Sequence, residues 1–504
     1  MTRLVVCCDG TWGTPDRKDR GVAAPTNVVR LYNALVEDGG QRRYYHPGVG
    51  AEGSWWEKAI AAGTGVGLER NIQSAYRWLC DNYSPGDDVY LFGFSRGAYT
   101  VRSLVGFINL CGLLDGRARQ PGDVWEAIEL LFREGYRAGI DQRAAWRRKG
   151  WQFLDSANER LPIRFVGVWD TVGALGIPDA MALLNLLDDP RKHRFHNTSL
   201  SRNIRTARHA VAMDELRQSF QPTLWTNTAE HPDCLQKWFP GVHADVGGGY
   251  YEAGLANGAL QWMLEEAQQA GLALQPSMLA QVTPNYHDMM HDSCTGPFSL
   301  LATQPRSVPS LLREELFHES ALRRHREPPI HQCPYRQPHF APDGSTIQVY
   351  AQQQWNATGL WLEAGRTYRF SAHGEWLDGS VRCGPTGAEV GHRQIGELRH
   401  LAGQALGKLE DWLRTTTGNP GADIAFTRRH EDMPWFCLVG CIANGGESDR
   451  PGEARAHEVF AVGRGCDYVP RRSGYFYAYA NDAWNCYGNN RGVIELTVTS
   501  PAPH

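Results

Sequence analysis

The chain has 504 residues, enough for about two or three domains, and its composition of 42% hydrophobic and 21% charged residues excludes disordered, collagen-like and disulfide-dense proteins. Its 51 Lys and Arg residues nearly balance 55 Asp and Glu residues, so the net charge of -4 excludes a general attraction to nucleic acid. No apolar run reaches the roughly 18 residues that span a bilayer, and the first residues do not resemble a Sec signal peptide. The 12 cysteines are expected to be buried thiols. We therefore expect the protein to be made and folded in a reducing cytoplasm, without Sec-dependent export.

The first half of the chain alternates β-branched segments with segments of helical periodicity, which predicts a mostly parallel sheet with helices on both faces. The predicted strands are, in chain order, Leu4–Asp9, Arg43–His46, Asp88–Gly93, Ile163–Asp170, Ala207–Met213 and Gln236–His243. The predicted helices are Asn27–Glu37, Gly67–Asn82, Ala98–Leu114, Trp125–Glu159 and Gly254–Ala270. This part of the chain is predicted to be an α/β domain.

After a stretch rich in Pro, Arg and His at 304–340, the pattern changes to alternation with a period of two residues and frequent glycine. Short strands are predicted to begin at Ile347, Gly359, Tyr368, Gly474 and Gly492. Strands without intervening helices favour an all-β sandwich. We place the boundary near residue 342, which predicts an α/β domain over 1–342 and a β-sandwich over 343–504.

A candidate nucleophile lies in Gly93–Gly97, which fits the pattern G-x-S-x-G around Ser95. The pattern alone is weak in a chain with 54 glycines, but here it follows a predicted strand and precedes a predicted helix. A strand, a sharp turn and a helix expose the serine hydroxyl and direct a helix N-terminus at developing negative charge. The alternative is an ordinary turn between a strand and a helix.

A serine hydroxyl becomes a good nucleophile when a histidine takes its proton, and an acid orients that histidine. Among 18 histidines His243 is the best placed, in a glycine-rich stretch that we expect to be a loop after a late strand. Asp170 and Asp214 each end a predicted strand and are both candidates for the acid. We favour Asp170, because small residues surround it, whereas Glu215 and Arg217 could pair with Asp214.

Two backbone N–H groups are needed to stabilise the oxyanion of the tetrahedral intermediate, and each is commonly worth about 10² to 10³ in rate. The first is predicted to be that of Arg96, directly after the nucleophile. The second is predicted to be that of Gly10 or Thr11, in the loop after the first strand. We expect Asp9 to fix this loop through hydrogen bonds.

These motifs together resemble the α/β-hydrolase domain of the first family of type VI secretion lipase effectors. The matching segments extend across almost all of residues 1–340, at 8–12, 45–50, 67–80, 85–104, 168–176, 212–220, 238–250 and 316–323. The resemblance implies hydrolysis of phospholipid esters by a triad of Ser95, Asp170 and His243. It also implies delivery into rival bacteria by a type VI secretion apparatus, with the secretion spike and an immunity protein as partners.

Residues 176–189 follow the candidate acid closely and carry an apolar cluster bounded by acidic residues. A short helix there would form a lid that exposes apolar side chains to lipid, within a helical insertion near 176–205. An ordinary amphipathic packing helix is the alternative.

The segment from Asn481 to Asn490 places one carboxylate and several amides in a loop between two predicted strands. Such oxygen ligands suit Ca²⁺, although a polar hairpin has the same composition. Together with 374–387 the loop resembles the calcium-dependent galactophilic bacterial lectins. The resemblance implies calcium binding by the side chains of Asp482, Asn489 and Asn490 and by the carbonyl of Cys486, and a glycan ligand near His392 and Gln394.

The leading hypothesis is therefore a serine hydrolase that cleaves acyl esters of membrane phospholipids as an antibacterial effector, needs no cofactor for catalysis, and uses the sandwich for targeting. One alternative is a cytosolic carboxylesterase or thioesterase that acts on small substrates. The other is a non-enzymatic, calcium-dependent glycan-binding protein whose α/β part is a scaffold.

Overall fold

The fold is given by a computed structural model of the chain. The structure describes residues 1–10, 13–48, 66–118, 120–156, 159–173, 199–300, 302–332, 334–336, 343–388, 429–447, 454–484 and 486–500. The expected lid at 176–189 lies outside these residues.

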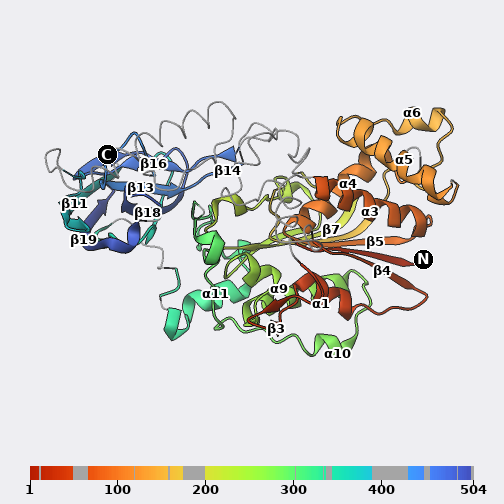
Figure 1. The fold of residues 1–504 in the computed structure, drawn as a ribbon, viewed down its shortest axis with the longest axis horizontal. Coiled ribbons are helices and arrows are strands. Elements are labelled where there is room, and N and C mark those ends of the chain that lie inside the picture. Colours follow the sequence, from red (N-terminus) through yellow and green to blue (C-terminus); the bar gives the residue numbers. More distant parts are fainter. Residues whose placement is uncertain are drawn as a thin grey trace.

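Within the described part of the chain, six parallel strands form the central sheet of the first half, in the order β4-β1-β5-β6-β7-β8 (Figure 1). They are β1 (Arg3–Cys8), β4 (Gln41–His46), β5 (Asp88–Phe94), β6 (Ile163–Trp169), β7 (Ile204–Ala212) and β8 (Cys234–Phe239). The central strands β1, β5 and β6 are buried at all but one position each, because a parallel sheet is covered on both faces. The α/β prediction is confirmed.

Helices cover both faces of this sheet (Figure 1). One face packs against α1 (Asn27–Ala34) and α9 (Gly254–Gln269), and α10 (Pro276–Leu279) lies against α1. The other face packs against α3 (Val66–Asn82) and α4 (Arg96–Cys111), α5 (Pro121–Leu131) packs on α3, and Trp146 of α6 (Arg143–Arg148) joins the same apolar cluster. The single helix predicted over Trp125–Glu159 is wrong. A π-helical turn (Phe132–Tyr136) follows α5, and the chain then turns at Gly139, whose φ of 68° is left-handed.

Shorter elements complete this part of the chain. They are β2 (Lys18–Asp19), β3 (Val22–Ala23), α8 (His243–Gly247), α11 (Glu319–Arg326) and the 3₁₀ turns Gly116–Ala118, Gln218–Phe220, Thr228–Glu230, Gly296–Leu300, Glu314–Leu316 and Ile330–Gln332. Because α8 begins at His243, the expectation that this histidine lies in a loop is wrong. The carboxylate of Asp245 accepts a hydrogen bond from the Val242 amide at 3.0 Å, which caps the helix.

Two antiparallel sheets form the C-terminal sandwich, and its core lies between them (Figure 1). One sheet has the order β10 (Asn356–Leu362), β18 (Gly474–Ala480), β13 (Leu438–Ala443), β16 (Glu458–Ala461). The other has the order β12 (Val381–Cys383), β11 (Tyr368–Asp378), β19 (Asn490–Thr499), β9 (Asp343–Tyr350), and β17 (Gly465–Tyr468) pairs with β11. A small ribbon pairs β14 (Gly446–Glu447) with β15 (Ala454–Arg455), and a 3₁₀ turn spans Tyr487–Asn489. The all-β prediction is confirmed.

Strands β13 and β18 are buried on both faces, unlike strands of a sandwich that face water on one side. Phe476 and Ala478 enter the core between the sheets, whereas Tyr475, Tyr477 and Tyr479 form a second cluster on the outer face. The hydroxyl of Tyr475 accepts a hydrogen bond from the Leu311 amide at 2.9 Å. The segment before the sandwich therefore packs against this face.

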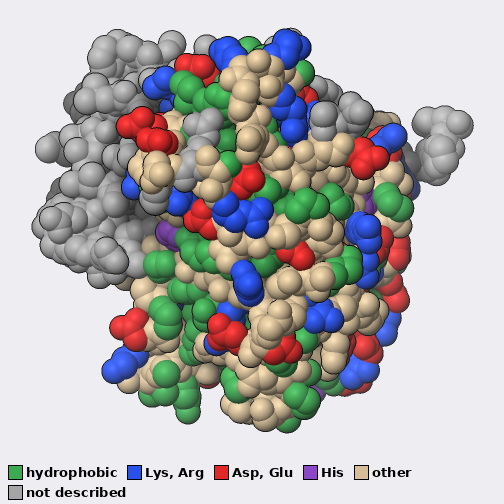
Figure 2. Space-filling model, turned by 90° about the vertical axis from the view of Figure 1, so that its right-hand side faces the viewer, with side chains coloured by type: hydrophobic (Ala, Val, Ile, Leu, Met, Phe, Trp, Pro, Cys, Tyr) green, Lys and Arg blue, Asp and Glu red, His purple; other side chains and the backbone are tan. Residues whose placement is uncertain are grey.

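Acidic and basic side chains are interspersed on the face of the molecule drawn in Figure 2. This agrees with the near balance of charges in the sequence. Among the described helices, none has the length and apolar character needed to cross a membrane. No disulfide joins the cysteines of the described ranges, in agreement with the expected thiols.

Candidate active site

Ser95 occupies the turn between β5 and α4, at the carboxyl end of the parallel sheet. Its φ of 57° and ψ of -122° lie outside the regions that side-chain-bearing residues ordinarily adopt, and such a conformation costs on the order of 1–3 kcal/mol. Two backbone hydrogen bonds hold it, from the Ser95 amide to the Trp169 carbonyl at 3.0 Å and from the Tyr99 amide to the Ser95 carbonyl at 3.2 Å. A Cβ atom on Gly97 would lie 2.0 Å from the Cys8 carbonyl oxygen, so glycine is required there. The predicted strand, sharp turn and helix are present.

The structure brings His243 and Asp170 together beside this turn. The Nδ1 atom of His243 lies 2.5 Å from Oδ2 of Asp170, and both side chains are buried. Asp170 directly follows β6 with a φ of 38°, and His243 opens α8 after β8. The ring of Phe94, the residue before Ser95, lies 4.6 Å from the imidazole ring. Three separate strand ends therefore deliver Ser95, Asp170 and His243 to one edge of the sheet.

The other candidate acid, Asp214, is engaged elsewhere. Its carboxylate accepts hydrogen bonds from the Tyr335 hydroxyl at 2.8 Å and from Nε of Arg336 at 3.0 Å. The expected pairing of Asp214 with Glu215 or Arg217 is wrong, because Arg217 binds Glu215 through two hydrogen bonds at 2.9 and 2.8 Å.

Arg306, which the sequence analysis did not single out, binds the carboxylate of Asp170 with both ends of its guanidinium. Nη1 lies 2.6 Å from Oδ1 and Nη2 lies 2.9 Å from Oδ2, and both side chains are fully buried. The Ala212 amide donates a further hydrogen bond to Oδ1 at 2.9 Å. Burial alone would raise the pKa of Asp170, but Arg306 and the hydrogen bond from His243 hold that pKa below its ordinary value. The carboxylate therefore stays ionised.

The imidazole of His243 is enclosed by aromatic rings. Phe220 meets it edge-on with a centroid distance of 5.0 Å, in addition to the contact with Phe94. Burial lowers the pKa of His243, while Asp170 acts to raise it. At neutral pH the ring is then neutral, with Nδ1–H donating to Asp170, so that Nε2 carries the lone pair that can accept a proton.

Glu215 is a second buried carboxylate, placed under the backbone of His243. It accepts hydrogen bonds from the His243 amide at 3.2 Å and from the Ser293 hydroxyl at 2.8 Å. Burial acts to raise its pKa, but Arg217 holds the pKa of Glu215 at about 2. The guanidinium of Arg217 also lies 3.6 Å from the centre of the Phe220 ring. This pair therefore fixes both the backbone of the histidine and a ring that packs on it.

Arg96 and Gly10, two of the predicted oxyanion donors, both lie next to Ser95, but the amide of Gly10 is bound to another group. Arg96 opens α4, where the helix dipole favours negative charge. Gly10 lies directly beside the nucleophile, because a Cβ atom there would be 3.1 Å from Cβ of Ser95, but its amide donates to Oδ1 of Asp9 at 2.7 Å. Thr11 lies outside the described residues. The carboxylate of Asp9 also accepts hydrogen bonds from the side chains of Thr26 at 2.7 Å and Tyr45 at 2.8 Å.

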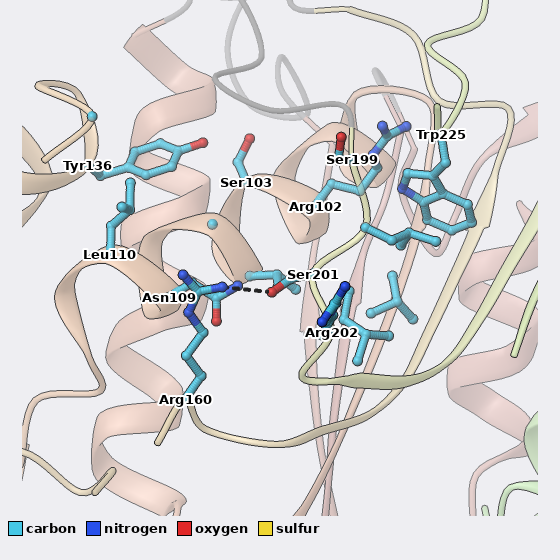
Figure 3. Close-up of a pocket in the computed structure, with 16 residues that line it drawn as sticks. Arg102, Ser103, Asn109, Leu110, Tyr136, Arg160, Ser199, Ser201, Arg202 and Trp225 are labelled. Carbon is cyan, nitrogen blue, oxygen red and sulfur yellow. Dashed lines mark hydrogen bonds between the residues drawn. The ribbon is translucent and has the colours of Figure 1, made fainter. Parts of the chain in front are cut away.

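A cavity of about 700 Å³ lies along α4, next to the segment that enters β7 (Figure 3). Ser103 and Asn109 from α4, residues 199–202 and Trp225 line it. The Trp225 ring is 5.2 Å from the ring of His209, whose Nε2 accepts a hydrogen bond from the Thr171 amide at 3.2 Å. Trp225 thus connects the wall of the cavity, through His209, to the residue that follows Asp170.

In the sandwich, the predicted calcium ligands Asp482 and Asn490 lie in contact. Nδ2 of Asn490 donates to Oδ2 of Asp482 at 2.8 Å, and Oδ1 of Asn490 is buried without a hydrogen-bond partner. Burial raises the pKa of Asp482 to about 6. The side chain of Asn489 donates instead to Asp378 at 2.8 Å. An orphaned amide oxygen beside a buried carboxylate fits a hard cation. His392 and Gln394 lie outside the described residues.

One curated protein is similar to part of this chain. A protein of Saccharomyces cerevisiae called uncharacterized is 29% identical over 240 residues, which are 44% of this chain and 32% of the yeast protein. The chain thus covers about a third of that relative's length.

Three solved structures are similar over parts of the chain. An uncharacterized protein from Pseudomonas aeruginosa has 18% identity and a TM-score of 0.34, covering 57% of this chain and 49% of its own. The Tle1 effector bound to the VgrG spike of the type VI secretion system has 14% identity and a TM-score of 0.35, covering 63% and 84%. The N-terminal domain of EclA, a PllA-like lectin, has 17% identity and a TM-score of 0.19, covering 31% and 94%.

The family model described as the catalytic domain of Tle1-like phospholipase effectors of the type VI secretion system matches residues 2–266, more than half of the chain. This region contains β1 to β8, the Ser95 turn, Asp170 and His243. The chain therefore belongs to the family of type VI secretion phospholipase effectors with a Tle1-like catalytic domain.

Proposed function

We propose that this member of the family is a serine hydrolase that cleaves acyl esters of phospholipids with Ser95, His243 and Asp170, and that it acts against rival bacteria. Family membership supports the phospholipase and effector classes. The observation that carries the assignment of residues is the 2.5 Å contact between His243 Nδ1 and Asp170 Oδ2, beside the strained turn of Ser95.

In the proposed reaction the Ser95 hydroxyl attacks the ester carbonyl carbon while Nε2 of His243 takes its proton. Asp170 holds the ring orientation and stabilises the imidazolium that forms. The tetrahedral intermediate then expels the lysophospholipid alcohol, which receives the proton from His243, and leaves an acyl group on Ser95. A water molecule, activated by the same histidine, attacks the acyl-enzyme and releases the fatty acid.

The amide of Arg96 is the first proposed oxyanion donor. The second is the amide of Thr11, or that of Gly10 once it leaves the carboxylate of Asp9. Gly10 lies beside Ser95, and Thr11 is the next residue in the chain. No cofactor takes part in this chemistry as we propose it.

We further propose that the sandwich is a targeting module that binds calcium and, through it, a glycan. Asp482 and Asn490, with the Cys486 carbonyl, would hold the ion, and Asn489 would join them on leaving Asp378. Ca²⁺, when bound, supplies a positive centre that sugar hydroxyls can coordinate. A secretion spike and an immunity protein are the proposed protein partners, and type VI delivery into target cells is the proposed route.

The decisive experiment is labelling with a fluorophosphonate probe, combined with fatty acid release from phosphatidylcholine liposomes. The parent protein is expected to label and to release fatty acid, Ser95→Ala to do neither, and the control Ser74→Ala in α3 to behave as the parent. Labelling of Ser95→Ala at the parent rate would refute the nucleophile. Cleavage of p-nitrophenyl esters without release from liposomes would support a small-substrate esterase instead.

Calcium binding is tested by titration calorimetry. Asp482→Asn is expected to abolish the binding, whereas Asp467→Asn, an exposed carboxylate paired with Arg369, is expected to leave it unchanged. Equal binding by both variants would contradict the proposed ligand set.

A further inference from the structure

We propose that Arg306 is the positioning residue of the triad acid and that the C-terminal sandwich holds Arg306 in place, so that hydrolysis in the α/β part depends on the sandwich. This inference rests on the proposed function of Ser95, Asp170 and His243. It concerns residues 302–311, which we call the Arg306 segment.

On its α/β side the Arg306 segment is anchored to the chain around the site. The Gln218 amide donates to the Ala302 carbonyl at 3.0 Å, and the Gln304 amide donates to the Leu216 carbonyl at 2.6 Å. Besides binding Asp170, Arg306 donates to the carbonyl oxygens of Ala212 at 2.6 Å and Phe220 at 2.5 Å. One guanidinium therefore joins the triad acid, the end of β7 and the residue whose ring packs on His243.

The Arg306 segment also binds the sandwich, through Thr303, Pro305 and Ser307. Nε1 of Trp355 donates to the Thr303 hydroxyl at 2.9 Å. The Ser307 hydroxyl donates to the Gly445 carbonyl at 2.6 Å. The Pro305 carbonyl lies 2.7 Å from Nε2 of His457.

The hydrogen bonds of His457 determine which of its ring nitrogens carries the proton. Its Nδ1 accepts a hydrogen bond from the Gly445 amide at 2.7 Å, so Nε2 must carry the proton that it donates to Pro305. Burial lowers the pKa of His457 to about 4, which keeps the ring neutral at physiological pH. The contact is therefore expected to persist at neutral pH, where the ring of His457 is uncharged.

Contacts with the two parts are interleaved along the Arg306 segment. The side chains of Thr303 and Ser307 and the carbonyl of Pro305 contact the sandwich, whereas the amide of Gln304 and the guanidinium of Arg306 contact the α/β part. The two sets of contacts are made by consecutive residues of one short piece of backbone, so a shift of this backbone on the sandwich side is expected to displace the guanidinium of Arg306. Asp170 and Arg306 are both fully buried, and a buried carboxylate tolerates the loss of its cation poorly. The sandwich thereby determines where the triad acid points.

The first test replaces Arg306 and measures hydrolysis of a soluble p-nitrophenyl ester, which involves no glycan. Arg306→Met is expected to lower kcat by about 10²-fold with little change in KM, because a misplaced catalytic group costs about that factor. It is also expected to move the acid limb of the pH–rate profile to higher pH, because Asp170 and His243 lose a neighbouring cation. Arg306→Lys is expected to recover part of kcat and of the pH shift. Parental kcat and pH profile in Arg306→Met would overturn the proposal.

The second test removes contacts with the sandwich and leaves Arg306 and the triad residues unchanged. His457→Ala and Ser307→Ala are expected to lower kcat for the same ester several-fold, measured well below their unfolding temperatures. Their matched controls, His373→Ala and Ser371→Ala on the exposed side of β11, are expected to keep the parental kcat. The double variant His457→Ala with Arg306→Lys should lower kcat by less than the product of the two single effects, because both substitutions act on kcat through the position of Asp170. Parental kcat in His457→Ala and Ser307→Ala would overturn the role of the sandwich.

The two levels of inference fail in different ways. Ser95→Ala that hydrolyses the ester at the parent rate would overturn the proposed function. An inactive Ser95→Ala together with fully active Arg306 variants would overturn only the positioning role.

Discussion

Asp170 and Asp214 are chemically identical and follow neighbouring strands, yet their surroundings give them different roles. Asp170 meets an imidazole and a buried guanidinium, whereas Asp214 is bound by Tyr335 and Arg336. What distinguishes them is thus the identity of the partners, which come from positions far away in the chain. At the scale of the residue, the acid is defined by its neighbours.

Replacement of the two acids should therefore have unequal effects. Asp170→Asn is expected to lower kcat by about 10⁴-fold, because an amide favours the wrong histidine tautomer. Asp214→Asn is expected to lower the thermal unfolding temperature while kcat per folded molecule changes little. The measurement is ester hydrolysis alongside thermal unfolding of both variants. The reverse order of activities would show that Asp214 is the acid.

The acid limb of the pH–rate profile belongs to the same scale. His243 faces Asp170, Glu215 and Arg217, and burial lowers its pKa below the ordinary value of about 6.5. Only the neutral ring accepts a proton from Ser95, so activity is lost as the pH falls through the pKa of the folded state. We expect half-maximal kcat/KM for a soluble ester below pH 6.5. A midpoint above about pH 7 would mean that Asp170 outweighs burial.

At the scale of elements, the close approach of β1 to α4 builds the nucleophile turn. The first turn of α4 lies against the end of β1, where Gly97 leaves no room for a side chain. This contact explains how a strained serine conformation persists, because neighbouring elements hold it from both sides.

Gly97→Ala should accordingly displace the turn. A Cβ atom 2.0 Å from backbone oxygen forces α4 or β1 to move, so we expect a loss of fluorophosphonate labelling of at least about tenfold and a lower unfolding temperature. Gly122→Ala in α5 is the matched control, since nothing lies within 4 Å of its Cβ position and alanine favours the helix. Equal labelling of the two variants would contradict the requirement for glycine at the turn.

At the scale of the whole molecule, the α/β part and the sandwich share an interface that includes buried hydrogen bonds. The Arg306 segment is tied to both, and the tyrosine face of β18 is covered. Two parts joined in this way are expected to lose their structures together.

Thermal unfolding should therefore show one calorimetric transition, with loss of ester hydrolysis at the same temperature. Ser307→Ala is expected to lower this temperature by about 1 °C, because a hydrogen bond contributes about 1 kcal/mol and the entropy of unfolding a chain of this length is about 1 kcal/mol/K. A separate transition of the sandwich that leaves hydrolysis intact would show that the two parts are independent.

Local patterns in the chain determine much of this protein. The alternation of strands and helices, the strand, turn and helix around Ser95 and the change to an all-β pattern near residue 342 follow from periodicity and glycine placement, which act between close neighbours. The periodicity does not predict the end of α5, because the π-helical turn that follows it continues the apolar spacing of a helix. The expected loop at His243 is wrong, because a local interaction, the hydrogen bond from the Val242 amide to the Asp245 carboxylate, caps a helix that begins there.

Tertiary structure alone decided which acid meets His243, and it brought Arg306 to Asp170 across 136 positions of the chain. No local pattern marks Arg306, which lies in a stretch whose composition is that of a linker. The physical reason is that a hydrogen bond depends on the positions of both partners, and those positions are set by how the sheet, the helices and the sandwich pack. The sequence by itself therefore determined the elements and the chemical groups that they carry, and packing determined which groups meet.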